Sequence, residues 1–225
     1  MRLFLLIASI ATLAACGRSL STAEESFAAE IFGPTIDPAR IRFIDGALVG
    51  QVTQTRDPRP RLACRERILP MPRGNTVKVS PAGVAIHNRI FFASDWYRRD
   101  YLPDWPRRIR LGSAMLLAHE ITHIWQWQNR EVTGYSPLRA ASEHGGGTDP
   151  YLFDIDTGSE FLDFGYEQQA GIVEEYVCCA ALDPHAPRTR RLAGLLRGAF
   201  PMQSLTIPDT VALPWPDAQT KDICR

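Results

Sequence analysis

Apolar positions in the first half of the chain follow the short spacing that is typical of strands. Residues 75–94 carry three short apolar runs separated by turn formers at residues 81–83 and 87–88, which predicts three strands joined by tight turns. Residues 40–54 alternate apolar and polar side chains imperfectly around the Asp-Gly pair at 45–46, a hairpin signal. We therefore expect a small antiparallel sheet in this half of the molecule.

Apolar positions in the second half recur every three or four residues, as they do on the buried face of a helix. This spacing predicts helices over residues 107–130, 161–183 and 187–200. Near the N-terminus, a capping signature ahead of an apolar series predicts a short helix over residues 19–30. Residues 142–160 contain four glycines and predict a long loop, a feature that is often functional inside a compact domain.

These elements indicate one domain of the α+β class. Roughly 210 residues after a leader suffice for one sizeable core and do not require a second. We expect this domain over residues 40–200, with the small sheet packed on the helices of 107–130 and 161–183. An anchor segment with the short helix, residues 16–39, precedes it, and a proline-rich tail, residues 201–225, follows it.

Residues 1–15 read as a leader rather than as part of the fold. One basic residue precedes an apolar run that suits a secretory signal and is too short to span a membrane comfortably. The run ends in Leu-Ala-Ala-Cys-Gly at 13–17, which resembles the lipobox of bacterial lipoproteins and would expose Cys16 for acylation. The alternative is a plain secretory signal cut near Ala15. We expect export to the periplasm or outer membrane of a Gram-negative bacterium, lipid-anchored through Cys16.

Four cysteines remain after the leader, and their even number favours disulfides in an oxidising compartment. Cys178 and Cys179 are neighbours on a predicted helix and point in different directions, so a bond between them would be strained. We expect Cys64 and Cys224 each to bond one of this pair, with the choice left open. The alternatives are reduced buried cysteines or a zinc cluster with four thiolate ligands.

The charge balance narrows the class of partner. The chain has 25 basic and 25 acidic residues. This balance argues against a nucleic-acid partner, because proteins normally bind the phosphate backbone of nucleic acids with a net basic surface. No second membrane-spanning run follows the leader, so we expect membrane contact only through Cys16. Nothing in the sequence indicates an oligomeric state.

Residues 119–123, His-Glu-Ile-Thr-His, carry the clearest chemical signal in the chain. On a helix, His119 and His123 lie on one face, where both could bind one tetrahedral metal ion. Glu120 is one position round from His119, where it can reach a water without binding the metal. This arrangement is typical of zinc peptidases, in which a zinc-activated water attacks the carbonyl and the glutamate acts as the base. The alternative is an ordinary amphipathic helix with two solvated imidazoles.

The predicted helix over 161–183 offers a third ligand. Glu167 and Glu174 share a face with the small Ala170 and Gly171, which would let this helix approach the His-Glu helix closely. We expect Glu167 to bind the metal and Glu174 to orient a histidine ligand through its ring N–H. The alternatives are that both glutamates are exposed charges, or that His144 in the glycine-rich loop is the ligand instead.

Four segments together resemble the Vgr-related metallopeptidases of bacteria, a gluzincin-like group. They span residues 83–92 (GVAIHNRIFF), 116–128 (LLAHEITHIWQWQ), 149–151 (DPY) and 166–176 (YEQQAGIVEEY). The resemblance implies a zincin-like fold. It also implies zinc ligands at His119, His123 and Glu167, with Glu120 as base. Many gluzincins have an aspartate four residues after the glutamate ligand, where this chain has Gly171, so Glu174 or another residue must take its role.

We therefore expect a zinc-dependent metallopeptidase that is lipid-anchored in the cell envelope and acts on peptides or proteins. Tyr151, Tyr166 and His144 are candidates for stabilising the oxyanion. The strand near residues 83–92 is expected either to pair with an extended substrate or to serve only as a core strand. The competing hypotheses are a catalytically silent zinc-binding lipoprotein and a zinc amidase acting on peptidoglycan.

Overall fold

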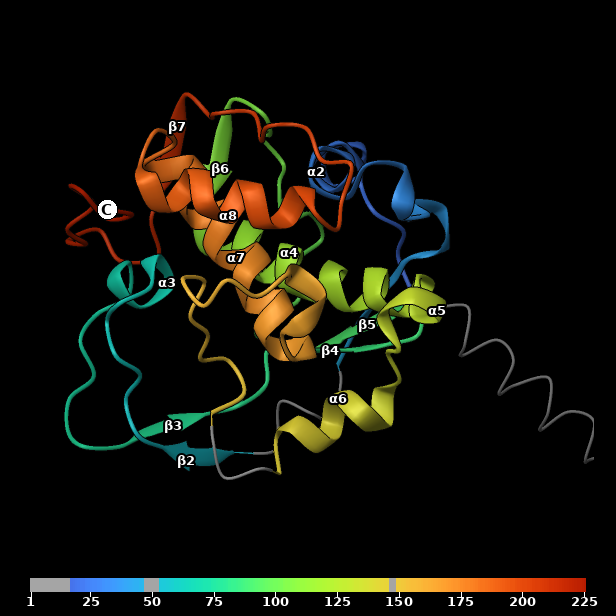
Figure 1. The fold of residues 1–225 in the computed structure, drawn as a ribbon, viewed down its shortest axis with the longest axis horizontal. Helices are drawn as coiled ribbons and strands as arrows, with labels where there is room; N and C mark the ends of the chain where they lie inside the picture. Colours follow the sequence, from blue (N-terminus) through green and yellow to red (C-terminus); the bar gives the residue numbers. More distant parts are fainter. Residues whose placement is uncertain (1–16, 47–52, 146–148) are drawn as a thin grey trace, which may run out of the picture.

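Two long helices, α4 (Leu111–Gln128) and α7 (Tyr166–Leu182), pack against each other at the centre of the molecule (Figure 1). The computed structural model describes residues 17–46, 53–145 and 149–225, so the predicted leader and Cys16 lie outside the described residues. Both helices are buried on most of their faces. They form the platform on which the other elements lie.

A three-stranded sheet covers α4, in the order β1-β5-β4. Its strands are β1 (Arg42–Asp45), β4 (Gly83–Ile86) and β5 (Arg89–Phe92). β1 runs parallel to β5 and β4 runs antiparallel to it. β4 lies at the edge of this sheet and contacts α4, so it is the strand next to the His-Glu motif.

Two smaller ribbons lie outside this sheet. β2 (Gln54–Arg56) pairs antiparallel with β3 (Val77–Val79), and β6 (Arg108–Arg110) pairs parallel with β7 (Thr210–Ala212). The second ribbon joins the start of α4 to the C-terminal tail. Residues 108–110, predicted as the first turn of a helix, are therefore extended.

The structure corrects two expectations about the sheet. The sheet is mixed rather than antiparallel, and the hairpin predicted around residues 45–46 is wrong, because β1 and β2 belong to different sheets. The amide of Gly46 donates to the carbonyl of Phe92, which keeps the chain along β5. The strands expected within 75–94 are present, but β3 pairs with β2 instead of β4.

The remaining helices surround this core. The helix predicted over residues 19–30 is α2 (Thr22–Phe32), which begins with a capping box between Ser21 and Glu24 and ends at Gly33. α8 (Pro187–Arg197) packs on α7 (Figure 1). Short helical segments complete the described fold: α3 (Cys64–Arg67), α5 (Arg130–Thr133), α6 (Pro137–Glu143) and 3-10 turns at Gly33–Thr35, Pro38–Arg40 and Phe161–Asp163.

Two disulfides fasten distant segments to α7. Cys64 bonds Cys178, which ties α3 to the helix, and Cys179 bonds Cys224, which ties down the C-terminal tail. The prediction that each of the neighbouring cysteines takes one distant partner is confirmed. Across residues 17–46, 53–145 and 149–225, none of the helices has the length and apolar character needed to cross a membrane.

Candidate functional site

His119, His123 and Glu167 direct three ligand atoms at one point between α4 and α7. Glu167 Oε2 lies 3.3 Å from His119 Nε2 and 3.5 Å from His123 Nε2. The three side chains are largely buried, and their ligand atoms all lie within 4.8 Å of one another. The structure therefore brings together the three residues that the sequence predicts as metal ligands.

These spacings fit a zinc ion. Two ligands that each lie about 2.1 Å from a tetrahedral zinc are roughly 3.4 Å apart, close to the separations seen here. Glu167 Oε2 is buried without a hydrogen-bond partner among the described residues, a costly arrangement that a cation would relieve. Two imidazole nitrogens and one carboxylate oxygen also form a common ligand set for catalytic zinc.

The electrostatics of this cluster favour positive charge. Burial alone would lower the pKa of His119, but the carboxylates of Glu167 and Glu174 outweigh it and raise this pKa to about 10. Burial alone would raise the pKa of Glu167, yet the three neighbouring histidines, His123 foremost, hold this pKa well below its usual range. The site thus keeps Glu167 ionised and attracts a cation.

A buried amide network sets the orientation of the His123 ring. Gln126 Nε2 donates to the carbonyl of Tyr166 and to Gln169 Oε1, at 3.0 and 2.9 Å. Gln126 Oε1 is therefore the acceptor at 2.8 Å from His123 Nδ1. His123 Nδ1 carries the proton, which leaves the lone pair of Nε2 facing the cluster.

Glu174 lies behind the ring of His119, where the sequence predicts it. Its Oε2 is 3.3 Å from His119 Nδ1, which is within ion-pair distance. The two atoms do not have good hydrogen-bond geometry, so this Nδ1 has no hydrogen-bond partner among the described residues. The same oxygen is 3.0 Å from Arg65 Nη1. Burial alone would raise the pKa of Glu174, but the charges of Arg65 and His119 lower it.

Glu120 lies beside the cluster and faces β4. A β-carbon built on Gly83 would stand 3.0 Å from the carboxyl carbon of Glu120, so this carboxylate occupies the space of a missing side chain. Glu120 Oε2 is buried without a partner among the described residues. Burial raises the pKa of Glu120, although the charges of His119 and His123 oppose the shift. A carboxylate in this environment is suited to accept a proton.

Two residues from α6 and its C-terminal end hold Glu167 in place. Glu143 accepts hydrogen bonds from the backbone amides of Tyr166 and Glu167, at 2.8 and 3.0 Å, and so caps the first turn of α7. His144 Nε2 lies 3.1 Å from Glu167 Oε1, the oxygen turned away from the histidine cluster. His144, the rival ligand, therefore contacts the glutamate and is not part of the three-residue cluster.

The candidate oxyanion tyrosines have different surroundings. Tyr151 stacks on His119, with ring centroids 5.8 Å apart, and burial raises the pKa of its hydroxyl. Tyr166 directs its hydroxyl to the carbonyl of Thr133 at 3.4 Å and does not line the cleft. The structure therefore favours Tyr151 over Tyr166 as a group that could contact a substrate.

Gly171 corrects a further expectation. A β-carbon on this residue would stand 3.1 Å from Phe153 Cε1 and 3.8 Å from the carbonyl oxygen of Tyr151. Its open side faces the segment that carries Tyr151, and not α4. Gly171 therefore makes room for the Phe153 ring rather than for the contact between the two central helices.

A cleft of about 930 Å³ opens over His119 and Glu120. Its lining includes Tyr151, His144 and Gly83, so the candidate groups face one space. The walls also carry cationic, acidic and apolar side chains: Arg56, Arg59, Arg65, Asp57, Asp149, Glu174, Leu69, Trp96, Met115 and Leu116. The cleft is large enough for a stretch of peptide.

Several residues of the site were not predicted from the sequence. Gln126 follows His123 by three positions, a helical spacing that marks it as a neighbour of the ligand. Glu143, Arg65 and Tyr135 carry no such signal, because they come from separate short elements. The Tyr135 ring lies 6.3 Å from the His123 ring, and burial raises the pKa of its hydroxyl.

The fold and the site together define a small α+β domain with a buried His-His-Glu cluster beneath an open cleft. No family model matches the chain. In sequence, the chain is 28% identical over 189 residues to the type VI secretion system spike protein VgrG2b of Pseudomonas aeruginosa. This match covers 84% of the chain, which spans only about 15% of the length of that relative.

In structure, the chain is similar to the effector domain of Pseudomonas aeruginosa VgrG2b. The TM-score is 0.53 at 24% sequence identity, and the match covers 80% of this chain and 84% of that domain. The chain is thus similar in sequence to a Vgr protein and in fold to the effector domain of one, as the resemblance to Vgr-related proteins predicts.

Proposed function

We propose that the protein is a zinc metallopeptidase. The observation that carries this proposal is the convergence of His119 Nε2, His123 Nε2 and Glu167 Oε2, with Glu120 alongside, under an open cleft. A site with three protein ligands and access from a cleft has the form of catalytic rather than structural zinc.

Each site residue has a distinct task in this proposal. His119, His123 and Glu167 would hold the metal, which when bound supplies a Lewis acid that polarises the scissile carbonyl and activates water. Glu120 takes the proton of the attacking water and delivers it to the leaving amine. Its burial suits both tasks, because a carboxyl with a raised pKa accepts a proton readily at neutral pH.

The walls of the cleft suggest how a peptide is positioned. β4 is an edge strand beside the catalytic helix, so we propose that its free edge pairs with the extended backbone of the substrate. We propose that the Tyr151 hydroxyl stabilises the oxyanion, since its ring lies against His119 within the cleft.

The cellular setting is also a proposal. The lipobox-like sequence supports export and a lipid anchor at Cys16, and two disulfides suit an oxidising compartment. The matched region of VgrG2b is described as an effector domain. By that similarity we propose that the peptidase acts on peptides or proteins in the bacterial envelope.

One observation favours a second candidate, a catalytically silent zinc-binding lipoprotein. His144 lines the cleft and lies 3.1 Å from Glu167 Oε1, and as a fourth ligand it would close the open position to substrate. In that case zinc would serve for structure or for binding a partner.

Cleavage of an unfolded protein by the Glu120→Gln variant distinguishes these candidates. The peptidase proposal predicts that the variant keeps its zinc and loses at least a hundredfold in rate, because the base is absent while all three ligands remain. An unmodified chain that binds zinc and cleaves no unfolded protein would support the silent lipoprotein instead.

A further inference from the structure

α3 holds Arg65 in a fixed place beside α7. The disulfide between Cys64 and Cys178 joins the two helices covalently. Glu175 on α7 accepts hydrogen bonds from the backbone amides of Cys64 and Arg65, at 3.0 and 3.4 Å. The backbone of α3, a helix of four residues, is therefore restrained at Arg65 by a disulfide and by hydrogen bonds.

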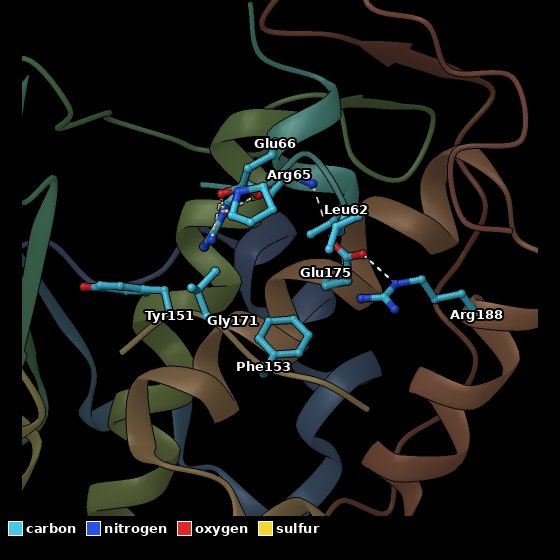
Figure 2. A pocket seen from close by; sticks show the side chains of 11 residues that line it. Leu62, Arg65, Glu66, Tyr151, Phe153, Gly171, Glu175 and Arg188 are labelled. Carbon is cyan, nitrogen blue, oxygen red and sulfur yellow. Dashed lines mark hydrogen bonds and ion pairs between the residues drawn. The ribbon is translucent and has the colours of Figure 1, made fainter. Parts of the chain in front are cut away.

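The side chain of Arg65 is equally restrained. Its Nη2 lies 2.9 Å from Glu66 Oε1, its Nη1 lies 3.0 Å from Glu174 Oε2, and the side chain is 16% exposed. Arg65 and Glu66 line a small cavity of about 80 Å³, as do Arg188 and Glu175. Figure 2 shows Arg65 paired with Glu66 and Arg188 paired with Glu175. A planar guanidinium that forms ion pairs with two carboxylates has little freedom to rotate.

Arg65 thereby controls the carboxylate behind the His119 ring. The oxygen of Glu174 that it binds is the same Oε2 that lies 3.3 Å from His119 Nδ1. Among the described residues, Arg65 and His119 are the two groups within ion-pair distance of Glu174, so loss of Arg65 would leave His119 alone. The Glu174 carboxylate could then rotate, and the His119 ring would lose the restraint that turns Nε2 toward Glu167.

We propose that Arg65 is a positioning residue of the metal site, acting through Glu174 to orient His119. This inference rests on the proposed zinc site but not on peptidase activity. Groups that orient a metal-binding histidine commonly contribute tenfold to a hundredfold in metal affinity. The short disulfide-bonded helix α3 is thus a functional part of the site, although it supplies no ligand.

Zinc affinity, measured by competition with a chromogenic chelator, tests this proposal on the chain from Gly17 onward, which contains all the described elements. Arg65→Gln is expected to weaken zinc binding by about tenfold to a hundredfold. Arg65→Lys is expected to recover part of this loss, because lysine restores the charge but not the paired donors.

Arg188→Gln is the matched control. Arg188 is 19% exposed and pairs with Glu175, the residue next to Glu174, but it forms no hydrogen bond or ion pair with His119 or His123. This variant is expected to lower the unfolding temperature and leave zinc affinity within about twofold. Variants are compared with thermal unfolding, so a loss of fold is seen separately from a loss of metal.

Three results would overturn the inference. The first is an Arg65→Gln variant that is folded and binds zinc as tightly as the unmodified chain. The second is an equal loss of affinity in Arg188→Gln, which would show a general packing effect. The third applies if Arg65→Gln does not fold: it is an Arg65→Lys variant that binds zinc as tightly as the unmodified chain. Failure of the peptidase proposal is distinguishable, because it would appear as normal zinc binding without cleavage.

Discussion

Gly83 lies directly against Glu120, and the absence of its side chain gives the carboxylate its place. A β-carbon on Gly83 would stand 3.0 Å from both the carboxyl carbon and Oε1 of Glu120. Gly83 is the first residue of the edge strand β4. The proposed substrate-binding strand therefore contacts the proposed base at this glycine. This contact makes Gly83 the most sensitive test of the geometry around Glu120.

Gly83→Ala is expected to lower the rate of peptide cleavage by about tenfold or more while zinc stays bound. The added methyl group would push Glu120 away from its position, and a small misplacement of a catalytic group is costly. The measurement is kcat/KM together with zinc content. Gly112→Ala is the control, because its β-carbon would meet only Pro214, at an ordinary 3.6 Å. Full activity in Gly83→Ala would contradict the assigned role of Glu120.

Gln126→Leu is expected to weaken zinc binding by about tenfold, because His123 loses the acceptor that fixes its ring. Stability should also fall, by about 2 kcal/mol, since the substitution leaves the buried Tyr166 and Gln169 acceptors unpaired. Chelator competition and chemical unfolding measure the two effects. Gln128→Leu loses only hydrogen bonds to Asp37 and Asn88, so its zinc affinity should be unchanged.

Removing the two disulfides separately should have different effects on the metal site. In the chain-entropy model of cross-links, loss of the Cys64–Cys178 bond should destabilise the fold by about 5 kcal/mol and loss of the Cys179–Cys224 bond by about 4 kcal/mol. Replacing Cys64 and Cys178 by alanine should also weaken zinc binding, because α3 then holds Arg65 less firmly. Replacing Cys179 and Cys224 should leave zinc affinity unchanged. Equal zinc affinities in the two double variants would contradict the link between α3 and the metal.

Arg18→Ala is expected to lower the free energy of unfolding by about 3 kcal/mol, because it removes the cation paired with a fully buried glutamate. Arg18 Nη1 lies 2.7 Å from Oε2 of Glu24, whose side chain is not exposed at all. Adding Glu24→Gln to Arg18→Ala should restore part of the loss. Urea unfolding of both variants measures this, and additive losses would argue against the coupling.

The motif on α4 was predictable because its geometry is local. His119 and His123 share a face by helical spacing, and the same spacing places Glu167 and Glu174 on one side of α7. Contact between α4 and α7 is then enough to bring these side chains together. The number of cysteines and the strain between two neighbours predicted that Cys178 and Cys179 each take one distant partner, but not which partner each one takes.

Contacts between distant segments could not be read from the sequence. The Asp-Gly pair at 45–46 signals a turn, but β1 continues beside β5, 47 residues further along the chain, because that pairing satisfies its backbone. Arg65 and Glu143 belong to helices of four and seven residues, whose positions depend on tertiary packing rather than on periodicity. Gly171 likewise packs against the Tyr151 segment, a loop whose path no local pattern predicts.

Zinc K-edge X-ray absorption on the purified chain tests the central claim most directly, because it reports the atoms bound to the metal. The account predicts one zinc per chain, with nitrogen and oxygen ligands at about 2.0–2.1 Å, including two imidazoles. It also predicts that Glu167→Ala loses most of this metal. Sulfur ligands at about 2.3 Å would place zinc at the cysteines instead, and a chain without zinc would contradict the proposed site altogether.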